Sequence, residues 1–125
     1  MDSIIFDKND AIDRVDGDID FLAELTKDFL AAFPAKFEEL QEAAKNNYNQ
    51  KVEKRAHSLK GALRNLGGIK SGDIAAALEL AGKNMDIHSI NALLSEFDKS
   101  VQEFEREFNV FLESSQTITS SNQTR

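Results

Sequence analysis

The sequence predicts an all-α fold, an antiparallel four-helix bundle with a short N-terminal helix as a lid. One proline and six glycines in 125 residues leave few turn signals for an all-β fold. Apolar residues recur every three or four positions along most of the chain, as helices require. Residues 1–115 therefore form one predicted helical domain. Residues 116–125, rich in Ser, Thr, Asn and Gln, form a predicted disordered tail.

The first predicted helix is short and spans about residues 9–15. Asn9 or Asp10 would cap its start, and Gly17 would end it. A helix this short needs tertiary packing to be stable, which is why we expect it to act as a lid. The apolar residues that would face inward are Phe6, Ile12 and Val15.

The second predicted helix begins at a cap at Asp18 and continues through Pro34. Its apolar residues keep helical spacing on both sides of the proline, which favours one long, kinked helix. Pro34 lacks the amide that would bond to Leu30, so two helices meeting near Phe33 remain the alternative. The predicted core positions are Leu22, Leu25, Phe29, Phe33, Phe37, Leu40 and Ala44.

The third and fourth helices are predicted on either side of the pair Gly67-Gly68. The third spans about residues 49–66. Its predicted core stripe is Val52, Ala56, Leu59, Leu63 and Leu66. The fourth would be capped by Ser71 and would stop at Gly82. Its predicted core residues are Ile74, Leu78 and Ala81.

The last helix has the most regular pattern, with steps that alternate between three and four. Its predicted core residues are Ile87, Ile90, Leu94, Phe97, Val101, Phe104, Phe108 and Phe111. Such a seven-residue repeat could instead form a coiled-coil dimer, but these positions hold mostly Phe rather than the preferred Leu and Ile. The short connections make neighbouring helices antiparallel, so we expect a monomeric bundle.

The composition excludes several classes of protein. A net charge of -7 argues against unaided binding to nucleic acid or to an anionic membrane. The sequence has no cysteine, no apolar run of about 20 residues and no signal-peptide pattern at its start. We therefore expect a cytoplasmic protein whose partner is another protein.

No common catalytic motif is present. The sequence lacks a Gly-rich phosphate loop, a GxSxG nucleophile elbow, an HExxH pair and a nucleophilic cysteine. The residues that a hydrolase, a nucleotide-binding protein or a zinc site of these common types would need are therefore missing from the sequence. We expect no cofactor and no metal bound to this chain itself.

One turn of the third helix carries the candidate site. On a helical wheel His57, Lys60, Gly61 and Arg64 lie together, opposite the core stripe, so His57 should face solvent. Gly61 is unexpected because a glycine inside a helix costs about 1 kcal/mol relative to alanine. Side chains lean toward the helix N-terminus, so a glycine four positions later leaves the imidazole uncovered.

This set suits transfer of a phosphoryl group to His57. The transition state spreads negative charge over three oxygens and needs in-line access. Lys60 would stabilise the phosphate, Gly61 would admit a partner, and Arg64 is a further candidate contact to phosphate or partner. Between residues 49 and 66 there is one acid, Glu53, and a partner with an acidic pocket would be attracted to the cations. These cations are Lys51, Lys54, Arg55, Lys60 and Arg64.

The string His57-Ser58-Leu59-Lys60-Gly61-Ala62, followed by Gly67, resembles the signature of histidine phosphotransfer (HPt) domains of multistep two-component signalling. The resemblance covers about residues 5–113. It implies a four-helix bundle that carries phosphate between aspartates of receiver domains and is not an enzyme on its own. By position, His57 matches the phosphorylated histidine, Lys60 the signature lysine and Gly61 the small residue.

The resemblance also implies the partners. Response-regulator receiver domains would supply Mg²⁺ and most catalytic groups, and a hybrid sensor histidine kinase is a further candidate partner. One alternative is a phosphoacceptor domain phosphorylated directly by the ATP-binding domain of a histidine kinase. Another is a helical interaction module that is never phosphorylated, which the intact His57 disfavours.

Overall fold

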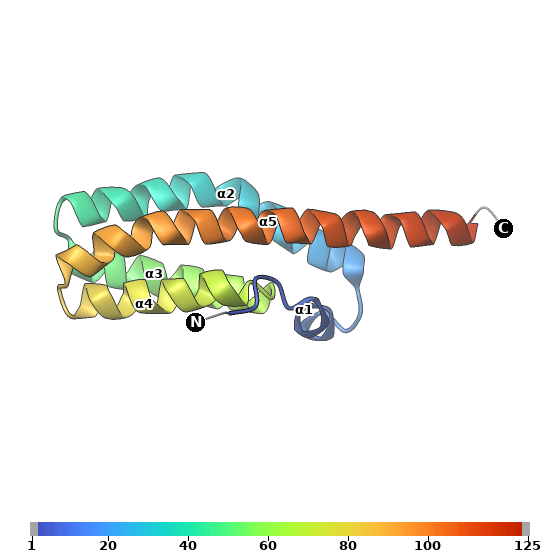
Figure 1. The fold of residues 1–125 in the computed structure, drawn as a ribbon, viewed down its shortest axis with the longest axis horizontal. Helices are drawn as coiled ribbons and strands as arrows, with labels where there is room; N and C mark the ends of the chain where they lie inside the picture. Colours follow the sequence, from blue (N-terminus) through green and yellow to red (C-terminus); the bar gives the residue numbers. More distant parts are fainter. Residues whose placement is uncertain (1–2, 124–125) are drawn as a thin grey trace.

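A computed structural model describes the backbone of residues 3–123 and the side chains of residues 3–115. Within this backbone all regular structure is helical, and neighbouring long helices run antiparallel (Figure 1). Four long helices pack around one core and a short helix lies at one end, which confirms the predicted fold class. The elements are α1 (Lys8–Arg14), α2 (Ile19–Lys45), α3 (Asn49–Asn65), α4 (Ile69–Lys83) and α5 (Ile87–Gln123).

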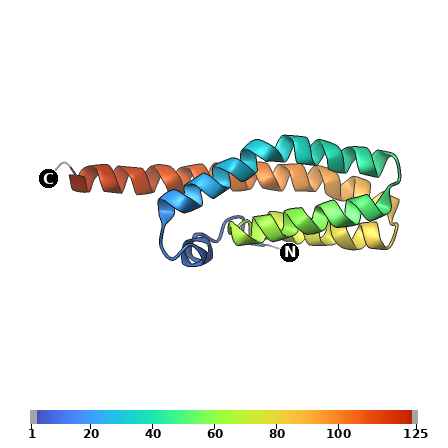
Figure 2. The same cartoon turned by 180° about the vertical axis from the view of Figure 1, so that it is seen from behind.

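The N-terminal segment and α1 close the end of the bundle where α2 and α5 extend beyond α3 and α4 (Figures 1 and 2). Ala11 of α1 is completely buried. The ring of Phe6 lies edge-on to three Phe rings of α5, with centroids 5.6 to 5.7 Å apart. The helix cap is Asp7, whose Oδ1 accepts from the Asp10 amide at 3.1 Å, and not Asn9 or Asp10 as predicted.

Helix α2 is continuous through Pro34, as its apolar pattern predicts, and it begins at the predicted cap Asp18. Figure 2 shows α2 change direction near its middle. The missing proline amide explains such a bend. One predicted core position is wrong: Leu25 is 39% exposed. At this end α2 instead buries the neighbouring face, which includes Leu22 and Thr26.

Both predicted ends of the fourth helix are wrong. Helix α4 begins after Gly68, and Ser71 is buried inside it, donating from Oγ to the Gly68 carbonyl at 3.3 Å. At the other end the helix continues through Gly82 to Lys83. Gly82 is required by packing, because a Cβ there would lie 2.8 Å from the backbone nitrogen of Glu53 on α3.

Helix α5 contributes the apolar stripe predicted for the last helix, including the fully buried Phe97 and Phe104. Ile87 is the exception and is 44% exposed, because it is the first residue of the helix at the end of the bundle. The helical backbone continues to Gln123, into the predicted tail, and no Gly or Pro interrupts it after residue 87. Residues 124–125 lie outside the described residues, and the domain boundary at residue 115 stays a prediction.

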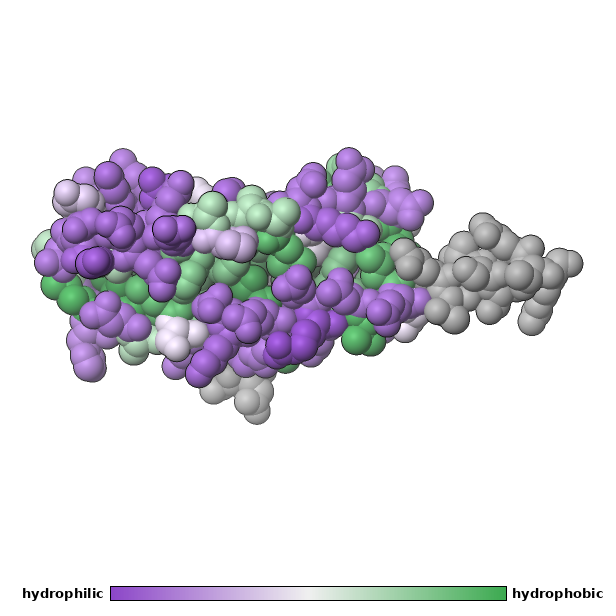
Figure 3. Space-filling view, turned by 90° about the horizontal axis from the view of Figure 1, so that it is seen from above, coloured by the Kyte–Doolittle hydropathy of each residue, from purple (hydrophilic) through white to green (hydrophobic). Residues whose placement is uncertain are grey.

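The surface seen from above shows a hydrophobic band along the molecule between hydrophilic margins (Figure 3). No described helix is long and apolar enough to cross a membrane.

Candidate functional site

The exposed face of α3 carries His57, as the helical wheel predicts. Its side chain is 65% exposed. The opposite face of the same helix is buried and supplies Val52, Ala56, Leu59 and Leu63 to the core. The core therefore fixes the rotation of α3 and holds the imidazole at the surface.

Glu79 on α4 joins His57 and Lys60. Its Oε2 lies 2.9 Å from Nδ1 of His57, and its Oε1 lies 2.7 Å from Nζ of Lys60. The side chains of Lys60 and Glu79 are only 21% and 25% exposed, whereas the histidine is open to solvent. One carboxylate thus orients both the ring and the lysine beside it.

The charge of Glu79 determines which nitrogen of His57 is free. The hydrogen bond from Lys60 is the largest cause that lowers the pKa of Glu79, and the hydrogen bond from His57 lowers it further, while burial partly opposes them. An ionised carboxylate only accepts hydrogen bonds, so the proton of the neutral ring lies on Nδ1. The lone pair of the neutral ring then lies on Nε2, and the side chain that carries it is 65% exposed.

Glycines on α4 let it lie close enough to α3 for Glu79 to reach the site. A Cβ at Gly82 would lie 2.8 Å from Glu53 N and 3.0 Å from Asn49 O, and both of those are backbone atoms. A Cβ at Gly72 would lie 2.9 Å from Cγ of Arg64. These contacts fix the spacing and register of the two helices.

Gly61 has a different environment from the glycines of α4. A Cβ built there would have nothing within 4 Å, so no contact with the described part of the chain requires a glycine. The residue is exposed one turn beyond His57. Its predicted role, access for a partner, is compatible with this open position.

Arg64 lies further along α3 than the other three predicted residues. It is seven residues beyond His57, or about 10 Å along the helix axis. Its Nη2 pairs with Oδ1 of Asp73 at 3.3 Å, and the other oxygen of Asp73 accepts from Ser3 at 2.9 Å. The structure thus brings His57, Lys60 and Gly61 together, and the contact of Arg64 with phosphate stays a prediction.

Glu79 is not among the site residues predicted from the sequence. A signal was available, because Glu79 and Asp73 are the only acids in a helix rich in alanine. The pairing with His57 nevertheless spans 22 positions and depends on the register of α3 against α4. A single sequence does not specify that register.

The site is an open depression of about 460 Å³. It is lined by Gln50, Glu53, Lys54, His57, Ser58 and Glu79. Among the described residues, no group of three or more His, Cys, Asp or Glu side chains is placed to hold a metal ion.

An exposed histidine with its Nδ1 held by a carboxylate, on the outside of a four-helix bundle, fits one class of protein, the phosphohistidine carriers. The family model described as the Hpt domain matches residues 24–107, and the chain belongs to this family. Hpt domains are phosphocarriers rather than enzymes, and they act with receiver domains and kinases in two-component relays.

The fold is similar to that of a solved structure, the histidine-containing phosphotransfer protein B (HptB) from Pseudomonas aeruginosa PAO1. The TM-score is 0.81 at 17% sequence identity, and the match covers 90% of this chain and 98% of that chain. No curated protein matches the sequence. The structural likeness establishes the fold, and the family match establishes the histidine phosphotransfer role.

Proposed function

We propose that this chain is a phosphorelay intermediate that accepts a phosphoryl group on His57 from a receiver-domain aspartyl phosphate and passes it to another receiver domain. The observation that carries the proposal is the hydrogen bond between Nδ1 of His57 and Glu79 on an otherwise exposed ring. It leaves Nε2 as the nucleophile, on a ring that is exposed enough for a partner to reach.

The transfer needs no group beyond the two proteins and the receiver's Mg²⁺. The Nε2 lone pair attacks phosphorus, the bond from phosphorus to the aspartyl oxygen breaks, and its electron pair leaves with the aspartate carboxylate. The ring becomes cationic and keeps its proton on Nδ1. The carboxylate of Glu79 stabilises that cation, since a hydrogen bond between charged groups is stronger than a neutral one. Donation to the second receiver is the same step in reverse.

Lys60 and Gly61 complete the proposed site. The ammonium of Lys60 lies beside the ring and can turn from Glu79 toward the phosphoryl oxygens, where it stabilises their negative charge. Gly61 leaves space for the partner beside the ring. Mg²⁺ belongs to the receiver in this proposal. A cytoplasmic location and a monomeric state, both predicted from the sequence, are also part of it.

The test is transfer of labelled phosphate from a panel of receiver domains phosphorylated on aspartate. We expect wild-type protein to acquire an acid-labile, alkali-stable label from at least one receiver, and His57→Gln to acquire none. His88→Gln is the matched control, because His88 is the other histidine and lies exposed at the start of α5. Acid-labile label on His57→Gln would disprove the site.

The same experiment decides the source of the phosphate. Each variant is also mixed with histidine kinase catalytic domains and ATP. Label acquired only from a kinase would contradict the relay and support direct phosphorylation. Label acquired from neither donor would contradict both and leave a helical interaction module.

A further inference from the structure

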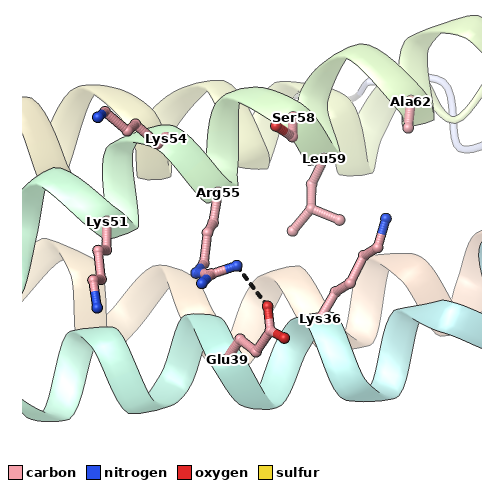
Figure 4. A pocket seen from close by; sticks show the side chains of 8 residues that line it. All are labelled: Lys36, Glu39, Lys51, Lys54, Arg55, Ser58, Leu59 and Ala62. Carbon is pink, nitrogen blue, oxygen red and sulfur yellow. Dashed lines mark hydrogen bonds and ion pairs between the residues drawn. The ribbon is translucent and has the colours of Figure 1, made fainter.

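A second depression, of about 390 Å³, lies between α2 and α3 beside the His57 site. We call it the basic groove. It is lined by Lys36, Glu39, Lys51, Lys54, Arg55, Ser58, Leu59 and Ala62. Figure 4 shows Lys36 reaching from α2 toward α3, while Lys51 and Arg55 reach from α3 toward α2. These three positive groups thus converge between the two helices, whereas Lys54 points away from α2.

The charges of the basic groove are poorly balanced within the chain. Arg55 pairs with Glu39, the only carboxylate of the lining. Among the described residues, no carboxylate lies within ion-pair distance of Lys36, Lys51 or Lys54. In a protein with a net charge of -7, this leaves a local excess of positive charge.

The basic groove is continuous with the phosphoryl-accepting site. Lys54 and Ser58 line both depressions. A protein that brings an aspartate in line with Nε2 of His57 must therefore cover part of the groove. Whatever that protein presents beside its own active site will meet the lysines.

We infer that the basic groove binds an acidic surface of the receiver domain next to its phosphorylated aspartate, and so selects among receivers. This inference rests on the proposed function. Mg²⁺ in the partner is held by carboxylates together with phosphate oxygens, so the surface around such a site is acidic. Charge complementarity of this kind raises association rates and excludes partners of the wrong charge.

The test is the double variant Lys36→Glu/Lys51→Glu, because neither residue lines the His57 depression. The matched control is Lys99→Glu/Arg106→Glu, with the same change of charge at exposed positions of α5. Circular dichroism checks that both are folded. The assay uses a phosphorylated receiver that labels wild-type protein.

We expect the second-order rate constant for transfer from that receiver to fall about tenfold or more in the groove variant, and to change about twofold or less in the control. Added salt should narrow the difference, because ions screen exposed charges. Labelling of His57 by phosphoramidate, a small donor with no docking surface, should be unchanged in both variants. NMR of the wild type should show shifts in groove amides when unphosphorylated receiver is added.

Equal transfer rates for the groove variant and the control would overturn the inference. So would a loss of phosphoramidate labelling in the groove variant, because the substitutions would then act on His57 itself. If no receiver labels the wild type, the proposed function fails first and the inference falls with it. The two failures can be told apart. Failure of the proposed function shows in the wild-type protein, whereas failure of the inference shows only when the groove variant is compared with its control.

Discussion

The carboxylate of Glu79 on α4 accepts a hydrogen bond from Nδ1 of His57 on α3 at 2.9 Å. The same carboxylate holds Nζ of Lys60 at 2.7 Å. The tautomer of the ring and the position of the lysine therefore depend on one residue of a neighbouring helix. Glu79 acts through His57, so it is a positioning residue in the proposed reaction.

Glu79→Gln should slow transfer at saturating receiver by about tenfold. The amide oxygen can still accept a hydrogen bond, but the charge that stabilises the cationic ring is lost, and a charged hydrogen bond exceeds a neutral one by about 1.4 kcal/mol. The imidazole ¹⁵N signals of His57 should show one tautomer in the wild type and a mixture in the variant.

Glu103→Gln is the control for this prediction, because it breaks another ion pair, to Lys70 at 3.0 Å, away from the site. It should leave both the transfer rate and the His57 signals unchanged. If Glu79→Gln slows transfer while the ¹⁵N signals stay those of one tautomer, the positioning role is incorrect.

Acid should remove the stabilising contribution of Glu79. Its folded-state pKa lies below the ordinary value of 4.5, chiefly because Lys60 donates a hydrogen bond to it. A carboxyl group with a lowered pKa stabilises the fold fully above its unfolded pKa and loses that contribution as the pH falls through the folded pKa.

Urea unfolding of the wild type and of Glu79→Gln at several pH values tests whether the contribution of Glu79 to stability falls with pH. The difference in their free energies of unfolding should shrink as the pH falls below 4.5. A difference that does not shrink below pH 4.5 would contradict the lowered pKa of Glu79.

Features that depend on the periodicity of one helix could be predicted from the sequence. The burial of Phe97 and Phe104 and the exposure of His57 each follow from spacing within their own helix. Arg64 was predicted on the correct face for the same reason. Its ion pair with Asp73 depends on α4 and was not predicted.

Features that depend on how two helices meet could not be predicted in this way. Gly82 was interpreted as a helix stop, but it is a point of close contact with α3. A glycine serves either purpose, and the sequence alone does not distinguish them. The link from Glu79 to His57 was missed for the same reason, since it depends on the register that this contact sets.

Gly61→Ala should make the protein more stable and slower in transfer. Alanine has the higher helix propensity, and a Cβ at this exposed position meets nothing within 4 Å, so stability should rise by about 0.5 to 1 kcal/mol. The methyl group would obstruct a receiver, and Gly61→Leu would obstruct it more. Urea unfolding and transfer rates measure the two effects separately.

Phosphoramidate labelling is the control for Gly61, because a small donor does not need the space that a receiver needs. It should be unchanged in Gly61→Ala. Transfer from a receiver to Gly61→Leu at the wild-type rate would show that access is not the role of this glycine.

Gly82→Ala should have the opposite effect on stability, although the substitution is the same. The new Cβ would lie 2.8 Å from Glu53 N and 3.0 Å from Asn49 O, and backbone atoms cannot rotate away as a side chain would. Overpacking of this kind costs about 1 to 3 kcal/mol, which outweighs the gain in helix propensity. Relief of the clash would move α4 from α3 and draw Glu79 away from His57.

Urea unfolding of the two alanine variants, side by side with imidazole ¹⁵N spectra, provides the measurement. Gly82→Ala should unfold at lower urea than the wild type and should lose the single tautomer of His57, whereas Gly61→Ala should unfold at higher urea and keep it. A Gly82→Ala protein as stable as Gly61→Ala would contradict the close contact of α3 and α4. A less stable Gly82→Ala that keeps the wild-type His57 signals would show that Glu79 reaches the ring without that contact.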